Sequence, residues 1–199
     1  MTPFHIALAQ INPVVGDLSG NAKLIRDAAE FAHRSGAKLL VTPELALTGY
    51  PPEDLLLRPA FIEAAADALD QLRTALAAYP GLAVVVGHPL KTTQGLHNAA
   101  SVLRDGQLIA SYAKHELPNN EVFDEVRYFT PGSKPCVFDI EGCAIGVIIC
   151  EDTWHTGPAA QAKAAGAQLL ISLNASPYHL QKENLRLEVL RKVISTIGL

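Results

Sequence analysis

Three residues of chemically reactive types stand at the ends of apolar runs that have the character of β-strands. Glu44, Lys114 and Cys150 each come directly after such a run. Folds of the α/β class commonly assemble their sites where a buried strand meets a loop. We therefore expect the three side chains to form one cluster, although they lie far apart along the chain.

The three residue types match the chemistry of amide hydrolysis. A thiolate is a strong nucleophile but is scarce at neutral pH, so Cys150 needs a neighbouring base or positive charge. Glu44 is a candidate for that base, and the Lys114 ammonium is suited to stabilise the oxyanion that forms on attack. The protonated Glu44 can then return its proton to the departing ammonia and afterwards activate water. Each residue alone also has an ordinary interpretation, as a core thiol, a solvated turn acid or a surface lysine.

The elements that must position this cluster follow from hydrophobic periodicity. Short apolar runs predict strands at residues 5–10, 38–43, 83–87, 99–104, 107–113, 136–140, 144–150 and 168–175. Apolar residues at three-to-four spacing predict helices at residues 21–35, 60–79, 158–165 and 180–197. Asp105-Gly106 and Glu141-Gly142 are hairpin turn signals. Hairpins in the middle and helical crossovers at both ends predict a mixed α/β fold.

Two further segments carry local signals. Residues 117–134 contain Pro and Asn with mixed charge and no periodicity, which predicts a functional loop. In the last helix the apolar face is wide, so we expect it to pack on a sheet or on a partner chain. Gly198 has the position of a helix C′ residue, and Leu199 that of the start of another strand.

Composition restricts the class of protein. The chain has 199 residues, 49% of them hydrophobic and 18% charged, which is enough for one domain with a closed core. The net charge of −4 offers no cationic surface for nucleic acid or anionic lipid. No basic leader precedes an apolar stretch, and no run approaches the ~18 apolar residues of a membrane span. We expect a cytoplasmic protein that acts on a small molecule.

Metal and serine chemistry have weaker support. The seven histidines show neither HxH nor HExxH spacing, and the three cysteines lack CxxC spacing, so we expect reduced thiols and no bound metal. Ser101 and Ser172 have no histidine partner suggested by a motif, which argues against a serine triad. The helical residues Arg186, Arg191 and Lys192 are most simply interpreted as a solvated face.

Four segments of the chain resemble motifs of the nitrilase superfamily of carbon-nitrogen hydrolases. They read LLVTPELALTGYPPEDLL, YAKHELPNNEVFDEVRYFTPG, IGVIICEDTW and LLISLNASPY, in that order. The similarity extends from ALAQINPVVGD to the last helix and so covers essentially the whole chain. It implies a four-layer α-β-β-α sandwich with mixed sheets, in a family whose subunits pair, so we expect a homo-oligomer.

Within the superfamily, the segments TGYPPEDLL, VFDEVRYF, CEDTW and NASPY are most similar to the glutaminase domain of glutamine-dependent NAD synthetases. That resemblance implies Glu44 as general base, Lys114 as oxyanion stabiliser and Cys150 as nucleophile, with a γ-glutamyl thioester as intermediate. It implies that the backbone N–H of Glu151 also holds the oxyanion. Glu125 resembles a second glutamate that supports the lysine; its alternative is a plain surface acid.

The resemblance also implies residues that shape a glutamine pocket. Tyr50, Glu151 and Ser176 match pocket positions, where an acid and a hydroxyl suit the α-amino and α-carboxylate groups. Trp154 is a candidate pocket wall, as is Phe129, and each has an ordinary core residue as its alternative. Asn120 stands where the family commonly has an aromatic residue, and Glu121 where it commonly has glycine. This departure affects the shape of the pocket and leaves the triad intact.

The synthetase half of such proteins is absent from these 199 residues, which contain no SGGxDS-type phosphate loop. The family's amidase fold also continues beyond this length, so we expect an amidase domain truncated at its C-terminus. The amidase half needs no cofactor; ATP and Mg²⁺ belong to the synthetase half. Two alternatives stay open: a free-standing hydrolase of another small amide, of the ω-amidase or carbamoylase type, or an inactive domain kept for assembly or ammonia channelling.

Overall fold

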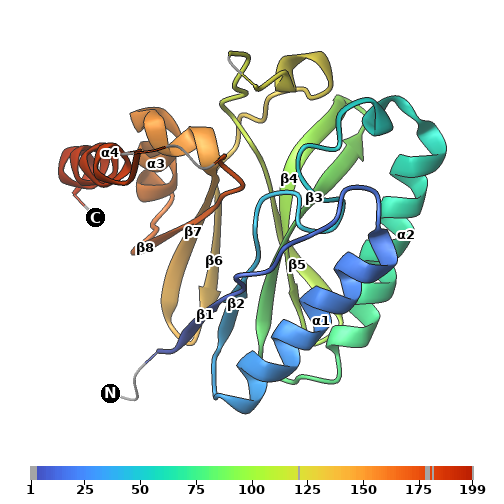
Figure 1. Cartoon of the computed structure of the whole chain (residues 1–199). Coiled ribbons are helices and arrows are strands. Elements are labelled where there is room, and N and C mark those ends of the chain that lie inside the picture. Colours follow the sequence, from blue (N-terminus) through green and yellow to red (C-terminus); the bar gives the residue numbers. More distant parts are fainter. Residues whose placement is uncertain (1–3, 121, 178–179, 181, 199) are drawn as a thin grey trace.

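Two mixed β-sheets pack face to face between two pairs of helices (Figure 1). The computed structural model describes residues 4–120, 122–177, 180 and 182–198. The larger sheet has the strand order β1-β2-β3-β4-β5. Its strands are β1 (Ile6–Leu8), β2 (Leu39–Val41), β3 (Ala83–Thr92), β4 (Gly95–Arg104) and β5 (Gln107–Ala113). The first three strands run parallel and the last two pairings are antiparallel.

The smaller sheet has three described strands, and its inner face meets that of the larger sheet. They are β6 (Cys136–Ile140), β7 (Cys143–Ile149) and β8 (Leu169–Leu173). In β7 the alternate residues Ile145, Val147 and Ile149 are fully buried in the core between the sheets. Val85 of β3 and Val102 of β4 belong to the same core cluster. This alternation fixes which face of each strand points inward.

Helices cover both outer faces. α1 (Leu18–Arg34) and α2 (Pro59–Leu76) pack on the larger sheet, where Leu40 and Val84 meet Ile25 and Leu72 in a second core cluster. On the other side lie α3 (Thr156–Ala164) and α4 (Lys182–Ile197) (Figure 1). The predicted α-β-β-α order is therefore confirmed. The apolar face of α4 stays largely exposed, with Leu187 43% and Ile194 45% accessible.

Local sequence explains where several elements begin and end. The Asp17 side chain accepts a hydrogen bond from the Gly20 N–H and so caps the start of α1. Pro59 opens α2 at a position where its missing N–H costs nothing. At the end of α4, Gly198 has a φ of 70° and donates to the Ile194 carbonyl, so it is the predicted C′ residue. The strand expected to start at Leu199 lies outside the described residues.

Both predicted hairpin turns are confirmed. Asp105 and Gly106 join β4 to β5, and Glu141 and Gly142 join β6 to β7. All four residues have positive φ, the pattern of a type I′ turn whose twist matches that of the flanking strands.

Among the helices described, none is long and apolar enough to cross a membrane.

A third hairpin, between β3 and β4, was not predicted. β3 continues past the expected end at Gly87 to Thr92, and β4 begins at Gly95 rather than Ala99. Pro89 lies inside this extension, where a central strand would lose a ladder hydrogen bond. β2, however, ends at Val41 opposite Val85, so β4 is the strand neighbour of β3 at Pro89 and the proline is tolerated.

The described residues of the segment 117–134 are irregular, as expected, except for a short 3₁₀ helix η2 (Glu125–Arg127). Two more 3₁₀ helices were not predicted, η1 (Glu53–Leu57) and η3 (Cys150–Trp154). Glu121, one of the two departures from the family motif, lies outside the described residues. α4 begins at Lys182, two residues later than predicted, and residue 181 is likewise not described.

Candidate active site

Glu44, Lys114 and Cys150 meet at one end of the paired sheets. Glu44 follows β2, Lys114 follows β5, and Cys150 follows β7 and opens η3. The three residues are almost entirely buried, at 2%, 0% and 5% accessibility respectively. Cys150 has a φ of 43°, which is unfavourable for a residue with a Cβ and turns the chain sharply after the strand.

The Lys114 ammonium is held between two carboxylates. Its Nζ donates to Glu44 Oε1 at 2.6 Å and to both carboxylate oxygens of Glu125 at 2.9 Å. Burial alone would lower the pKa of Lys114, but the negative charges of Glu44 and Glu125 outweigh it and raise the pKa. Lys114 therefore carries a full positive charge at neutral pH, and Glu125 is buried at the site rather than a surface acid.

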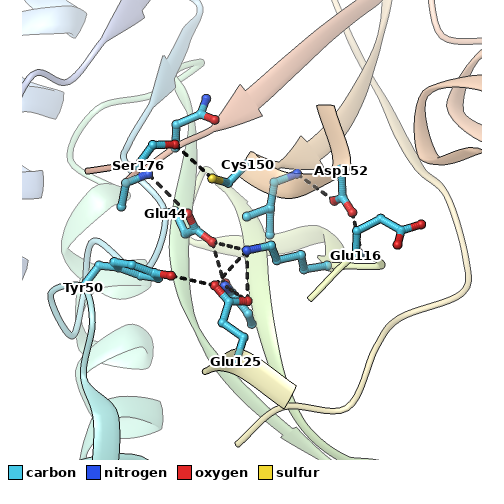
Figure 2. A network of polar contacts seen from close by, with 12 residues as sticks. Glu44, Tyr50, Glu116, Glu125, Cys150, Asp152 and Ser176 are labelled. Carbon is cyan, nitrogen blue, oxygen red and sulfur yellow. Dashed lines mark hydrogen bonds and ion pairs between the residues drawn. The ribbon is translucent and has the colours of Figure 1, made fainter. Parts of the chain in front are cut away.

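Two neutral side chains complete this charged group. The Asn98 side-chain amide donates to Glu44 Oε1 at 2.8 Å and to Glu125 Oε2 at 3.4 Å. The Tyr50 hydroxyl donates to Glu125 Oε1 at 2.9 Å (Figure 2). Burial, and then the nearby charge of Glu44, raise the pKa of Glu125, while Lys114 opposes them. No sequence signal indicated Asn98, which lies within the buried strand β4.

The Cys150 sulfur faces the same group from the other sheet. Ser176 Oγ lies 3.2 Å from Cys150 Sγ (Figure 2). The backbone N–H of the preceding residue, Ala175, donates to Glu44 Oε2 at 3.2 Å. Burial, followed by the negative charge of Glu44, raises the pKa of Cys150 to about 12, against the opposing effect of Lys114. The resting thiol is therefore protonated at neutral pH, and attack requires a group that accepts the proton.

A cavity of about 310 Å³ opens onto the Cys150 thiol. Four of the residues predicted to bind substrate line it, namely Asn120, Glu151, Trp154 and Ser176. Lys182 and Arg186 of α4 line it as well. The interpretation of Arg186 as part of a solvated face was therefore wrong, because its side chain is half-buried and donates to the Pro177 carbonyl at 3.3 Å. Arg191 and Lys192 are exposed, as expected.

Tyr50 does not line that cavity, and neither does Phe129. Tyr50 lines a second cavity of about 330 Å³ beside Glu44, which shares Ser176 with the first. Its hydroxyl is engaged with Glu125, so its observed contact supports the buried carboxylate. Phe129 is buried in a third core cluster with Leu45, and with Tyr50 it lines a small cavity of about 120 Å³.

Ser101 has a histidine partner that the sequence did not indicate. His88 Nε2 lies 2.7 Å from Ser101 Oγ, and His88 Nδ1 lies 2.9 Å from the Pro89 carbonyl. The carbonyl can only accept, so Nδ1 carries the proton and the Ser101 hydroxyl donates to Nε2. Both side chains are buried, at 2% and 1% accessibility, and burial lowers the pKa of His88 to about 4. The pair holds β3 to β4 and is closed to substrate.

No group of three or more His, Cys, Asp or Glu side chains suited to a metal ion occurs among the described residues. The three cysteines are free thiols. Cys136 is buried in the core between the sheets, and burial raises its pKa to about 11, while Cys143 is half-buried in β7.

Known proteins have sequences similar to this chain over most of its length. The sequence profile of a family described as Carbon-nitrogen hydrolase matches residues 5–195. A "Glutamine-dependent NAD(+) synthetase" of Xylella fastidiosa is 44% identical over 201 aligned positions, which cover 98% of this chain and 36% of the relative. One of Thermotoga maritima is 41% identical, with 96% and 33% covered. The chain thus spans about a third of the length of these curated relatives.

Solved structures give the same result at the level of the fold. A glutamine-dependent NAD+ synthetase from Acinetobacter baumannii, in complex with ADP, superimposes with a TM-score of 0.90 at 34% identity, covering 98% of this chain and 37% of that one. An amidase from Nesterenkonia sp. superimposes with a TM-score of 0.78 at 29% identity, covering 90% and 67%. With a family profile matched over nearly all of its residues, the chain belongs to the carbon-nitrogen hydrolase family.

Proposed function

We propose that this chain hydrolyses the side-chain amide of glutamine through a covalent thioester on Cys150. The observation that carries this proposal is the fully buried Lys114 ammonium, held between two carboxylates beside a thiol that opens onto a cavity. Such an arrangement supplies a nucleophile, a proton acceptor and a fixed positive charge in a water-poor site. The relatives named as glutamine-dependent support glutamine as the amide.

The first half-reaction forms the thioester. Because the thiol of Cys150 is protonated, its proton passes to Glu44 as Sγ bonds to the amide carbon. The C=O electron pair moves to oxygen, and the resulting oxyanion is stabilised by the Lys114 ammonium and by the backbone N–H of Glu151. When this intermediate collapses, the C–N bond breaks and Glu44 protonates the nitrogen. Ammonia leaves and the γ-glutamyl group stays on sulfur.

The second half-reaction uses the same groups in reverse. Glu44 takes a proton from water, whose oxygen bonds to the thioester carbon, and Lys114 again stabilises the oxyanion. The C–S bond then breaks, and the proton held by Glu44 returns to sulfur. Glutamate is released and the thiol of Cys150 is restored. Glu125, Asn98 and Tyr50 touch the charged groups and keep Glu44 and Lys114 in place.

Charge and shape in the cavity suit an amino acid. We assign the α-amino group to Glu151 and the α-carboxylate to Ser176 together with Lys182, which brings a positive charge to the same cavity. The Trp154 ring forms an apolar wall, and Lys182 Nζ lies 6.0 Å from the centre of that ring. Asn120 forms another part of the cavity wall.

In the longer proteins to which this chain is similar, we propose that the ammonia is passed to a synthetase part. That part would use ATP and Mg²⁺ to amidate nicotinic acid adenine dinucleotide to NAD, as the resemblance implies. The amidase half itself requires no cofactor. We further propose that the protein acts in the cytoplasm as a homo-oligomer.

The test is Cys150→Ala in the full-length protein, with Cys143→Ala as matched control. Loss of the nucleophile should reduce glutamine hydrolysis by several orders of magnitude and leave the circular dichroism spectrum unchanged. NAD formation should fail with glutamine but persist with an ammonium salt. Cys143→Ala should keep both activities.

Other outcomes would decide against the proposal. Undiminished glutamine turnover in Cys150→Ala would remove Cys150 from the mechanism. A wild-type protein that hydrolyses ω-amides or carbamoyl compounds but leaves glutamine intact would be a free-standing hydrolase. A wild-type protein that hydrolyses no amide, while its synthetase part uses ammonium, would be an assembly or channelling domain.

A further inference from the structure

Asp152 is a buried carboxylate whose hydrogen-bonding capacity is used entirely by neutral donors. Its accessibility is 0%. Oδ1 accepts from the backbone N–H groups of His115 at 3.1 Å and Glu116 at 2.9 Å. Oδ2 accepts from the Tyr112 hydroxyl at 2.8 Å and from the Ile149 N–H at 2.9 Å. Holding a negative charge out of water in this way is costly unless all its acceptor sites are filled.

These four donors belong to the two chain segments that carry the charge and the nucleophile. His115 and Glu116 come directly after Lys114 at the end of β5, and Ile149 comes directly before Cys150 at the end of β7. The strands belong to different sheets, with no ladder between them. Figure 2 shows the Asp152 carboxylate close to Glu116, on the side of Cys150 away from Ser176. The carboxylate thus joins the two sheets at the reactive end.

The geometry at Cys150 explains why such a link is needed. Its φ of 43° is a conformation that persists only when surrounding contacts hold it. Asp152 provides one of these contacts by accepting the Ile149 N–H within the first turn of η3. The same side chain fixes the backbone that follows Lys114. A shift of about 1 Å between a nucleophile and its electrostatic partner is enough to cost ~10²-fold in rate.

We propose that Asp152 is a positioning residue that sets the Lys114 ammonium relative to the Cys150 sulfur in the transition state of amide hydrolysis. The proposal rests on the function proposed above for the same site. Asparagine at this position would preserve volume, but it has one acceptor oxygen and one donor group. In either orientation, the amide NH₂ would face two of the four donors and leave at least one backbone N–H without a partner.

The experiment compares Asp152→Asn, Lys114→Ala and the double variant in the full-length protein, with kcat and KM for glutamine expressed per folded site. We expect Asp152→Asn to lower kcat by ~10²-fold with KM within about twofold of wild type. If Asp152 acts through Lys114, the two losses are not additive, and the double variant should be no more than about threefold slower than Lys114→Ala. A purely structural role would lower the folded fraction and leave kcat per folded site unchanged.

Asp139→Asn is the matched control. Asp139 is an exposed residue of β6 whose side chain accepts the Gly142 N–H at 3.0 Å in the β6–β7 hairpin, remote from Lys114 along the chain. Its kcat should equal that of wild type. Should Asp152→Asn fail to fold, Tyr112→Phe removes one of the four donors and enters the same cycle with Lys114→Ala; we expect a smaller loss of about threefold, again not additive.

Two results would overturn the positioning role. The first is a wild-type kcat per folded site in Asp152→Asn, or in Tyr112→Phe if Asp152→Asn does not fold. The second is a double variant whose fold-loss in kcat equals the product of the two single fold-losses. Neither result touches the proposed function. That function fails separately, if the wild-type protein itself does not hydrolyse glutamine.

Discussion

Lys114 illustrates how strongly the site depends on a single ammonium group. It is fully buried and donates to Glu44 and Glu125, so one positive charge compensates two negative charges. Asn98 and Tyr50 add neutral donors to the same oxygens. Removing one member of a buried ion group leaves an uncompensated charge, which is more costly than losing the attraction alone. We therefore expect substitution of Lys114 to affect stability and, under the proposed mechanism, turnover as well.

Lys114→Met tests both properties. Turnover should fall by ~10²-fold or more because the oxyanion loses its main stabilising charge. The free energy of unfolding at pH 7.5 should fall by roughly 3–5 kcal/mol because two carboxylates then face each other without a cation. Glu63, exposed on α2, offers the control Glu63→Gln, which should change neither quantity measurably.

The pH dependence of that variant has a defined sign. Burial and the charge of Glu44 already raise the pKa of Glu125, and loss of Lys114 removes the principal opposing effect. A carboxyl group whose folded-state pKa exceeds its unfolded value contributes stability at low pH, which is lost as the pH rises through the folded pKa. The stability gap between Lys114→Met and wild type should narrow between pH 7.5 and 5.5 in urea titrations. A gap that widens on acidification would contradict the charge argument.

The protonation state of Cys150 can be measured directly. Burial, and then the charge of Glu44, raise its pKa to about 12, so the proton stays on sulfur throughout the neutral range. The difference in ultraviolet absorbance near 240 nm between wild type and Cys150→Ala should show no thiolate from pH 6 to 9. The signal should appear only at higher pH. A thiolate signal at pH 7 would indicate a preformed ion pair with Lys114 in place of proton transfer to Glu44.

At the scale of the elements, the turns after β2 and β7 place the reactive groups. Leu45, directly after Glu44, has a φ of 48°, and Cys150 has a φ of 43°. Such conformations in residues with a Cβ cost on the order of 1–3 kcal/mol and need close packing around them. Gly87 of β3 provides it for the first turn. A Cβ at Gly87 would lie 2.5 Å from the Leu45 nitrogen and from the Pro43 carbonyl oxygen.

Gly87→Ala should therefore displace the Glu44 turn. Backbone atoms cannot give way as a flexible side chain can, so we expect a loss of roughly 1–3 kcal/mol in unfolding free energy and a fall in kcat of at least tenfold. Gly157→Ala in α3 is the matched control, because its Cβ would meet nothing within 4 Å. It should retain activity and keep or gain stability, since alanine favours helix over glycine. Equal activity in the two variants, measured by ammonia release, would show that the turn has room to move.

How well the sequence predicted each element depended on whether local signals decide its bounds. β5 and β6 begin and end at the predicted residues, with a two-residue turn beside each. The β3–β4 extension was missed because His88 and Pro89 are poor strand residues on local grounds. They are accommodated by tertiary contacts, the Ser101 hydroxyl for the histidine and the early end of β2 for the proline.

For the molecule as a whole, the motifs predicted a cluster of Glu44, Lys114 and Cys150, and the structure places these residues together. Sequence reasoning missed the polar residues whose roles depend on partners far away in the chain. Asn98 contacts Glu44 across 54 positions, and Asp152 contacts Tyr112 across 40. Contacts between residues so far apart along the chain follow no sequence periodicity, so they cannot be read from a sequence. Each of these polar side chains would be unfavourable in the core without its partner.

The division of the site between the two layers has one more consequence. Glu44 and Lys114 follow strands of the larger sheet, and Cys150 follows a strand of the smaller sheet. If one sheet slid over the other by a single residue repeat, about 3.3 Å, the Cys150 sulfur would move away from the Glu44 carboxylate and the Lys114 ammonium. The hydrogen bonds between strands within each sheet would stay intact. Turnover should therefore respond to a misalignment of the two sheets that measurements of secondary structure would not detect. We therefore expect substitutions at Val102 or Val147, both fully buried in the core between the sheets, to change turnover by altering the alignment of the two layers.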